Sequence, residues 1–234
     1  MVDTLNCARI TMLALGDCIN PCEIAVLAMV LMAILVQNQD KRKKVLYGGL
    51  AFVAAVYIGY FIYGLILIQL FNSFAEFLRQ NSSYFYNGLA IIAMILGALN
   101  IKDYIMYKPG SFATEMPIWM RPKVKRIINK ITSAKGAFIT GFLVTIFLLP
   151  CTMGPYIVAS WLLADLWILK ALPWLLYYNA IFVLPMLIII AIVYFGFAKV
   201  DQVSGWKEAH IRKLHLASGI LMFLVGLALL MGWI

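Results

Sequence analysis

Charged residues are scarce in this chain of 234 residues. Asp, Glu, Lys and Arg together make up 12% of it, whereas a soluble domain carries about 25%. Hydrophobic residues make up 64%, well above the usual fraction of about 45–50%. This composition excludes a disordered chain, a secreted mini-protein and an ordinary water-soluble enzyme. We therefore expect an all-α integral membrane protein, with the lipid bilayer as its surroundings.

Many motifs of enzymes and cofactor-binding proteins are also missing. The sequence contains no phosphate-binding loop, no haem-attachment CxxCH, no zinc-ligand spacing and no Ser/His/Asp constellation. It has four cysteines and two histidines, and we expect neither a cofactor nor a bound metal. The net charge of +9 would suggest nucleic acid in a soluble protein. Here the charge belongs to connections between membrane spans, so no nucleic-acid partner is expected.

Six apolar stretches are long enough to cross a bilayer. Each has more than about 18 residues with few charges, as a transmembrane helix requires. Together they leave little chain for a soluble domain. The predicted spans are Ile10–Val36, Val45–Phe71, Tyr84–Met106, Gly136–Ala164, Leu166–Ala198 and Leu214–Trp233.

Lysine and arginine predict the orientation. Sixteen of the nineteen lie in or beside the first, third and fifth connections between spans, and an excess of Lys and Arg marks cytoplasmic connections. The chain is therefore predicted to be a multi-pass protein of the cell membrane with both termini extracytoplasmic. Aromatic residues near the outer ends of the fourth and fifth spans are interpreted as a belt at the membrane–water interface. They are Trp161, Trp167, Trp174, Tyr177 and Tyr178.

Two Pro-Cys pairs indicate an internal repeat. Pro21-Cys22 in the first span and Pro150-Cys151 in the fourth are 129 residues apart, and the same separation relates Gly97 to Gly226. Because three is an odd number of spans, the second copy of the repeat has to enter the membrane from the opposite side to the first. This predicts an inverted repeat of 3+3 helices. The predicted units are residues 1–106, a cytoplasmic basic connection over 107–135, and residues 136–234.

The Pro-Cys pairs lie among polar residues that are unusual inside a membrane. Proline kinks or breaks a helix, and polar groups at membrane depth usually face a cavity or the bundle interior. A helix that restarts at Cys22 or Cys151 would present unpaired N–H groups to the sulfur, which favours the reactive thiolate. The bland alternative is a helix kink with small packing residues. The candidate site residues are Asp17, Cys18, Asn20, Pro21, Cys22, Glu23, Pro150, Cys151, Thr152, Gly154 and Pro155.

Four cysteines allow more than one pairing. Symmetry would bring Cys22 and Cys151 together near the repeat axis, as candidates for one reversible disulfide. Cys18 and Cys22 are four residues apart, which in a regular helix is too far for a disulfide and needs a broken helix. Cys18 is interpreted first as a small buried residue, with a resolving thiol or half of a metal site as alternatives. Cys7 has no symmetric mate and is interpreted as incidental.

The paired motifs resemble those of a known family. Asp17-Cys18-Ile19-Asn20-Pro21-Cys22, together with Leu149-Pro150-Cys151-Thr152-Met153-Gly154-Pro155, is similar to the cytochrome c biogenesis transmembrane family (CcdA and the membrane domain of DsbD). The resemblance implies a thiol–disulfide oxidoreductase with Cys22 and Cys151 as its redox pair. It implies cytoplasmic thioredoxin as donor and an extracytoplasmic thioredoxin-like protein as acceptor, in cytochrome c maturation. Cys18 is extra to that pattern.

Two other functions fit the same residues. A small-solute or soft-metal transporter would use the broken helices as a binding site, with Cys18, Cys22 and Cys151 as ligands and Asp17 or Glu23 compensating the charge. A structural membrane subunit would carry no exchange chemistry at all. The oxidoreductase predicts reversible formation of a disulfide. The transporter predicts that metal protects the thiols, and the structural subunit predicts that Cys22→Ser has no effect.

Overall fold

The computed structural model describes residues 7–18, 21–37, 42–73, 82–106, 122–123, 126, 133–164, 166–196 and 200–231. Side chains at 21–23, 82–86 and 147–154, and at some other positions inside the helices, lie outside this description. The helices are α1 (Cys7–Cys18), α2 (Pro21–Gln37), α3 (Arg42–Ser73), α5 (Ser82–Ile105), α7 (Ala134–Ala164), α8 (Ile168–Tyr194) and α9 (Val200–Leu230).

Four helices of the described chain are long and apolar enough to cross a membrane: Lys43–Ser73, Asn87–Ile105, Ile168–Tyr194 and Ala209–Ala228. They lie within α3, α5, α8 and α9 and correspond to the second, third, fifth and sixth predicted spans. The first and fourth predicted spans are represented by shorter apolar stretches in α2 and α7. These lengths and compositions are those of a membrane α-helical protein.

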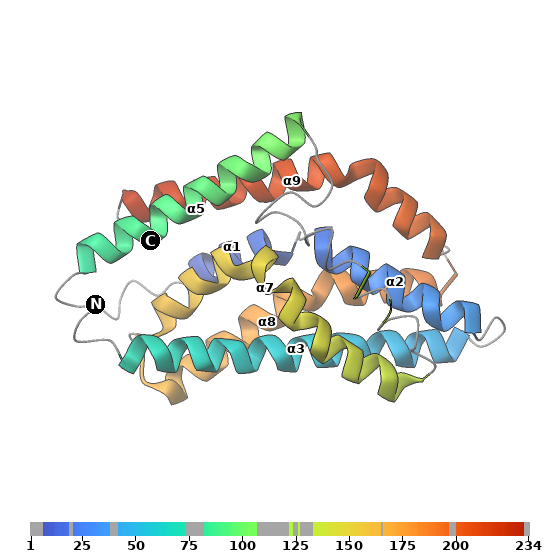
Figure 1. The fold of residues 1–234 in the computed structure, drawn as a ribbon. Coiled ribbons are helices and arrows are strands. Elements are labelled where there is room, and N and C mark those ends of the chain that lie inside the picture. Colours follow the sequence, from blue (N-terminus) through green and yellow to red (C-terminus); the bar gives the residue numbers. More distant parts are fainter. Residues whose placement is uncertain are drawn as a thin grey trace.

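The helices pack in an arched arrangement (Figure 1). α5 and α9 lie side by side along one side of the molecule, α3 lies along the opposite side, and α1 and α2 lie between them. The most extensive helix contacts are those of α5 with α9 and of α3 with α7. α3 also packs on α8, so α3, α7 and α8 form one group of mutually packed helices.

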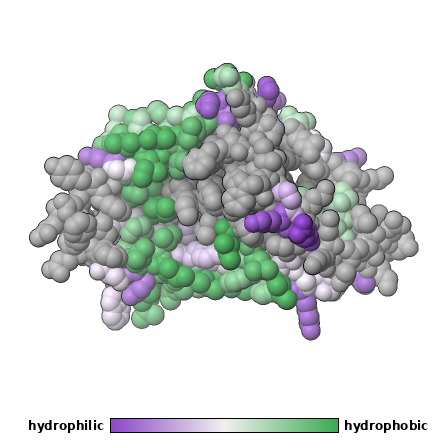
Figure 2. All heavy atoms as spheres, in the orientation of Figure 1, coloured by the Kyte–Doolittle hydropathy of each residue, from purple (hydrophilic) through white to green (hydrophobic). Residues whose placement is uncertain are grey.

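Large apolar side chains cover much of the outer surface. Figure 2 shows areas of such residues on one face of the molecule. On α5 they include Ile91, Ile92 and Ile95, and on α8 Leu184 and Ile188, all of which are exposed. Exposed apolar patches of this extent are typical of surfaces that face lipid or another protein, and in a protein with spanning helices they suit a lipid bilayer.

Two helix ends differ most from the sequence-based boundaries. The sixth span was predicted to begin at Leu214, but α9 already begins at Val200. Hydropathy marks only the apolar part of a helix, and here the helix continues through a polar segment. The fifth span was predicted to reach Ala198, but α8 ends at Tyr194. There Gly196 adopts φ 80°, a left-handed conformation that glycine accepts at little cost and that commonly ends a helix.

Glycines allow α5 and α9 to approach backbone to backbone. A Cβ atom at Gly97 would lie 2.7 Å from the Phe223 nitrogen and 2.9 Å from the Gly219 carbonyl oxygen. A Cβ atom at Gly226 would lie 2.9 Å from the Met94 nitrogen and 2.8 Å from the Ala90 carbonyl oxygen. Small residues at such crossings are typical of helix pairs in membranes.

Candidate functional site

The two Pro-Cys pairs occupy different backbone environments. Pro21 and Cys22 are the first residues of α2, and α1 ends at Cys18, so the first predicted span is divided into two helices as Pro21 predicted. Proline suits the first position of a helix because its missing N–H would be unpaired there in any case. Pro150 and Cys151 lie inside α7, which continues to Ala164 but changes direction along its length (Figure 1).

The side chains of the predicted redox pair, Cys22 and Cys151, lie outside the described residues, so their separation stays a prediction. The helices that carry them do meet, since α1 and α2 each contact α7. Of the supporting residues, Pro155 is buried, and Asn20 is outside the described chain altogether. The remaining predicted side chains that lie outside it are those of Pro21, Glu23, Pro150, Thr152 and Gly154.

Asp17 and Cys18 are both buried in the last turn of α1. The side chain of Asp17 is 3% exposed, and that of Cys18 is 8% exposed. The Tyr178 hydroxyl donates a hydrogen bond to Asp17 Oδ2 at 3.0 Å, and the Cys18 thiol donates to the Leu15 carbonyl at 3.3 Å. A carboxyl group buried without such a donor would be strongly unfavourable, so Tyr178 stabilises Asp17 in this position.

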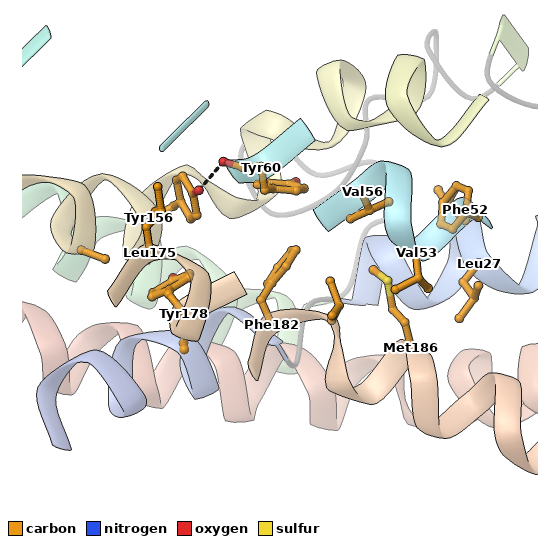
Figure 3. Close-up of a cluster of buried hydrophobic side chains, with 14 of the residues drawn as sticks. Leu27, Phe52, Val53, Val56, Tyr60, Tyr156, Leu175, Tyr178, Phe182 and Met186 are labelled. Carbon is orange, nitrogen blue, oxygen red and sulfur yellow. Dashed lines mark hydrogen bonds between the residues drawn. The ribbon is translucent and has the colours of Figure 1, made fainter. Parts of the chain in front are cut away.

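Tyr178 belongs to a larger group of buried hydrogen-bonding side chains. The Tyr156 hydroxyl donates to the Tyr60 carbonyl, and Asn179 Nδ2 donates to the Tyr156 hydroxyl at 3.4 Å. The rings of Tyr156 and Tyr178 meet edge to face with centroids 5.3 Å apart. We call this group the buried tyrosine cluster; its members are Asp17 of α1, Tyr60 of α3, Tyr156 of α7, and Tyr178 and Asn179 of α8. Figure 3 shows its three tyrosines among the buried apolar side chains.

The interface belt predicted from the aromatic residues is wrong for two of its members. Trp167 is 76% exposed and fits a belt, but Tyr178 is fully buried and Trp161 nearly so. Tyr178 faces α1 rather than lipid because its hydroxyl bonds to Asp17. The sequence signal for this pairing was weak: a single carboxyl in an apolar helix requires a donor, but nothing in the spacing identifies a tyrosine 161 residues away.

A second buried polar contact joins α5 to α9. His215 Nδ1 lies 2.9 Å from Asn100 Oδ1, and Asn100 Nδ2 donates to the Leu96 carbonyl. Asn100 Oδ1 is therefore the acceptor and His215 Nδ1 the donor. Asp103 is buried one turn further along α5. Within the described ranges, no group of three or more His, Cys, Asp or Glu residues could hold a metal ion.

Chemically, the described site combines a buried carboxyl, a buried thiol and three tyrosines beside a helix break. These groups position helices and surround a reactive centre, but they do not by themselves form a nucleophile–base pair. Comparison of the chain with protein-family models, with curated proteins and with solved structures found no match.

Proposed function

We propose that this protein is a transmembrane thiol–disulfide oxidoreductase with Cys22 and Cys151 as its redox pair. It passes reducing equivalents from cytoplasmic thioredoxin to an extracytoplasmic thioredoxin-like protein, and through it to the thiols of cytochrome c maturation. The observation that carries the proposal is that neither predicted span with a Pro-Cys pair is one straight helix. The first pair lies at the division between α1 and α2, and the second pair lies inside the bent α7, which both of those helices contact.

We also propose that the chain is an inverted repeat of six spans, with both termini extracytoplasmic. Reciprocal contacts support this architecture. Gly97 meets Phe223 and Gly219, while Gly226 meets Met94 and Ala90, and each residue of the first set differs from its counterpart by 129.

A second reciprocal pair relates α3 to α8. Gly49 meets Ile190, while Gly64 meets Leu175, and these residues correspond with a separation of 126. Buried positions recur at the same separation, for example Val45 with Ala171. When 126 is added to the residue number of Gly49 and subtracted from that of Ile190, the result is the other contact. A two-fold axis that relates the two halves of the chain produces this pattern.

The chemistry needs no bound cofactor. A thiolate of the donor attacks the Cys22–Cys151 disulfide, the S–S bond breaks and a mixed disulfide forms. The second donor thiol attacks that bond, so the donor leaves as a disulfide, and Cys22 and Cys151 gain two electrons and two protons. The same steps in reverse reduce the disulfide of the acceptor on the other side.

Alternating exposure allows one pair to serve two partners. The hydrocarbon core is about 30 Å thick, so sulfurs near its middle lie about 15 Å from either surface. A thioredoxin has to reach the sulfur directly, which requires a cavity that opens to one side at a time. The start of α2 at Pro21 and the bend of α7, which contains Pro150, together with Asn20, Thr152, Gly154 and Pro155 nearby, would supply the irregular backbone that such a cavity needs.

Thiol trapping tests this function. Membranes carrying Cys22→Ser or Cys151→Ser are incubated with oxidised thioredoxin. The thiolate of the remaining cysteine of the pair attacks the thioredoxin disulfide, so a mixed disulfide forms and one thioredoxin thiol is released, which is alkylated to keep the adduct. The two variants should yield different levels of mixed disulfide, and Cys7→Ser should behave as the unchanged protein. The unchanged protein should show a reversible Cys22–Cys151 disulfide. Metal-dependent protection of the thiols with no thioredoxin adduct would instead identify a soft-metal transporter.

A further inference from the structure

The buried tyrosine cluster lies on one side of the Pro-Cys pairs. Asp17 precedes Pro21 in the chain, on the half of the first span that begins at Cys7. Tyr156 follows Cys151, on the half of α7 that ends at Ala164. Both halves lead from the Pro-Cys pairs toward the same predicted side of the membrane, which is the extracytoplasmic side in the proposed orientation.

On that side, hydrogen bonds join the helices. Thr11 donates its hydroxyl to the Cys7 carbonyl, so the Tyr177 hydroxyl, 2.9 Å away, donates to Thr11 Oγ1. One residue further along α8, Tyr178 donates to Asp17. Tyr156 then links α7 to α3 and α8 within the buried tyrosine cluster. Helices α1, α3, α7 and α8 are thus connected through side-chain hydroxyls.

On the other side of the Pro-Cys pairs, α2 packs mainly against α9 and α3. α2 packs against α7 and α8 much less extensively than α1 does. Every described side chain of α2 is apolar, so none of these described side chains offers a hydrogen bond. In the first half of α7, Ile139, Leu143 and Ile146 are exposed.

The repeat makes this difference visible residue by residue. A separation of 129 relates α1 and α2 to α7, and one of 126 relates α3 to α8. With these separations, every member of the buried tyrosine cluster has an apolar counterpart. Figure 3 shows tyrosines 60, 156 and 178 toward one end of the core and the counterparts Leu27, Phe52 and Met186 toward the other. The pairs are Asp17 with Ile146, Tyr60 with Met186, Tyr156 with Leu27, Tyr178 with Phe52, and Asn179 with Val53.

We propose that the buried tyrosine cluster is the external gate of the Cys22–Cys151 site and that this structure is the form closed on the external side. The proposal rests on the proposed function and orientation. Opening this side separates Asp17 from Tyr178 and leaves both groups without their partner in a low dielectric, which is unfavourable. Opening the cytoplasmic side exchanges mainly apolar contacts among the described side chains, with the Tyr63–Thr145 contact as an exception, and lipid replaces apolar contacts at little cost. The resting protein therefore favours the form that accepts its cytoplasmic donor.

Labelling of one thiol from each side of the membrane tests the gate. In a protein carrying Cys7→Ser, Cys18→Ser and Cys151→Ser, Cys22 is the sole remaining cysteine. A membrane-impermeant maleimide is applied to vesicles of each orientation, and the labelling rate is measured. Cys22 should react from the cytoplasmic side and much more slowly from outside.

Tyr178→Phe then removes one hydroxyl and keeps the ring. Loss of a hydrogen bond of about 1 kcal/mol should raise the external rate about fivefold. Tyr63→Phe is the matched control, because its hydroxyl contacts Thr145 at 3.3 Å on the other half of α7, and it should leave the external rate unchanged. If Tyr178→Phe does not retain labelling from the cytoplasmic side, it is misfolded, and Tyr156→Phe takes its place with the same expectation.

An external rate that stays at its starting value in every folded cluster variant would overturn the gate, as would an equal rise in Tyr63→Phe. So would labelling of the starting protein at equal rates from both sides. The assay needs neither thioredoxin nor electron flow. Failure to trap a thioredoxin adduct would therefore refute the redox function and leave the result for the gate intact.

Discussion

Substitution of Gly97 by alanine should separate α5 from α9 and destabilise the protein. The new Cβ atom would lie 2.7 Å from the Phe223 nitrogen and 2.9 Å from the Gly219 carbonyl oxygen. Ordinary contacts between such atoms lie at about 3.5–4.0 Å. Both neighbours are backbone atoms, so no side-chain rotation relieves the overlap, and the helices have to move apart by roughly 0.5–1 Å.

The magnitude follows from two opposing effects. Overpacking of a close contact costs about 1–3 kcal/mol, while alanine gains about 0.5–1 kcal/mol over glycine inside a helix. The net loss is therefore up to about 2.5 kcal/mol, and the midpoint of thermal unfolding should fall by up to about 10 °C for a chain of this size. Thermal unfolding in detergent micelles, followed by circular dichroism, measures this shift.

Gly88 supplies the matched control on the same helix. A Cβ atom there meets nothing within 4 Å, so Gly88→Ala should leave the midpoint unchanged or raise it. Gly226→Ala should lower it about as much as Gly97→Ala, because its contacts are the reciprocal ones. A midpoint for Gly97→Ala equal to or above that of Gly88→Ala would refute the backbone contact between α5 and α9.

Three further predictions concern buried contacts. Asn100→Leu and His215→Leu should each cost about 1–3 kcal/mol, because each removes the hydrogen bond between the two buried side chains. The double variant should cost less than the sum, as a double-mutant cycle measures, and additive losses would contradict the pairing. Gly64→Ala should lower the unfolding midpoint more than Gly49→Ala. A Cβ atom at Gly64 would lie 2.5 Å from a methyl carbon of Leu175, whereas a Cβ atom at Gly49 would lie 3.0 Å from the flexible end of the Ile190 side chain. A larger fall for Gly49→Ala would count against these contacts. Asp17→Asn keeps an oxygen that accepts the hydrogen bond from Tyr178, and an amide is cheaper to bury than a carboxylate. The midpoint of thermal unfolding should therefore be unchanged or higher. A loss of stability above about 2 kcal/mol would show that the charge itself is required.

The long helices were predictable from sequence because lipid-facing and core-facing residues are both apolar. Hydropathy placed the second span at Val45–Phe71, and α3 extends only a few residues beyond it at each end. Pro21 correctly predicted the division between α1 and α2. Pro150 did not end α7. Proline is tolerated inside a membrane helix because neighbouring helices can satisfy the backbone groups that it leaves without a partner. The two prolines inside α8 illustrate the same tolerance.

The buried tyrosine cluster could be predicted only in part. Asp17 was singled out because a carboxyl group in an apolar span is costly, and it is buried and hydrogen-bonded. Asn179 could have been singled out for the same reason, because its side-chain amide lies within an apolar stretch of sequence. Tyr60 and Tyr156 carry none, because tyrosine occurs both in cores and at membrane surfaces. Their partners lie on other helices, and the sequence pattern contains no information about which helices are neighbours.

The contact of Gly97 and Gly226 has a consequence for how the molecule can move. At Gly97 the nearest atoms across the crossing are backbone atoms of Phe223 and Gly219, so at that point no side chain has to repack when one helix turns against the other. Reorientation of the two halves is therefore expected to follow an axis through this crossing. Points on opposite sides of such an axis travel in opposite directions, so widening at one membrane face and narrowing at the other become a single movement.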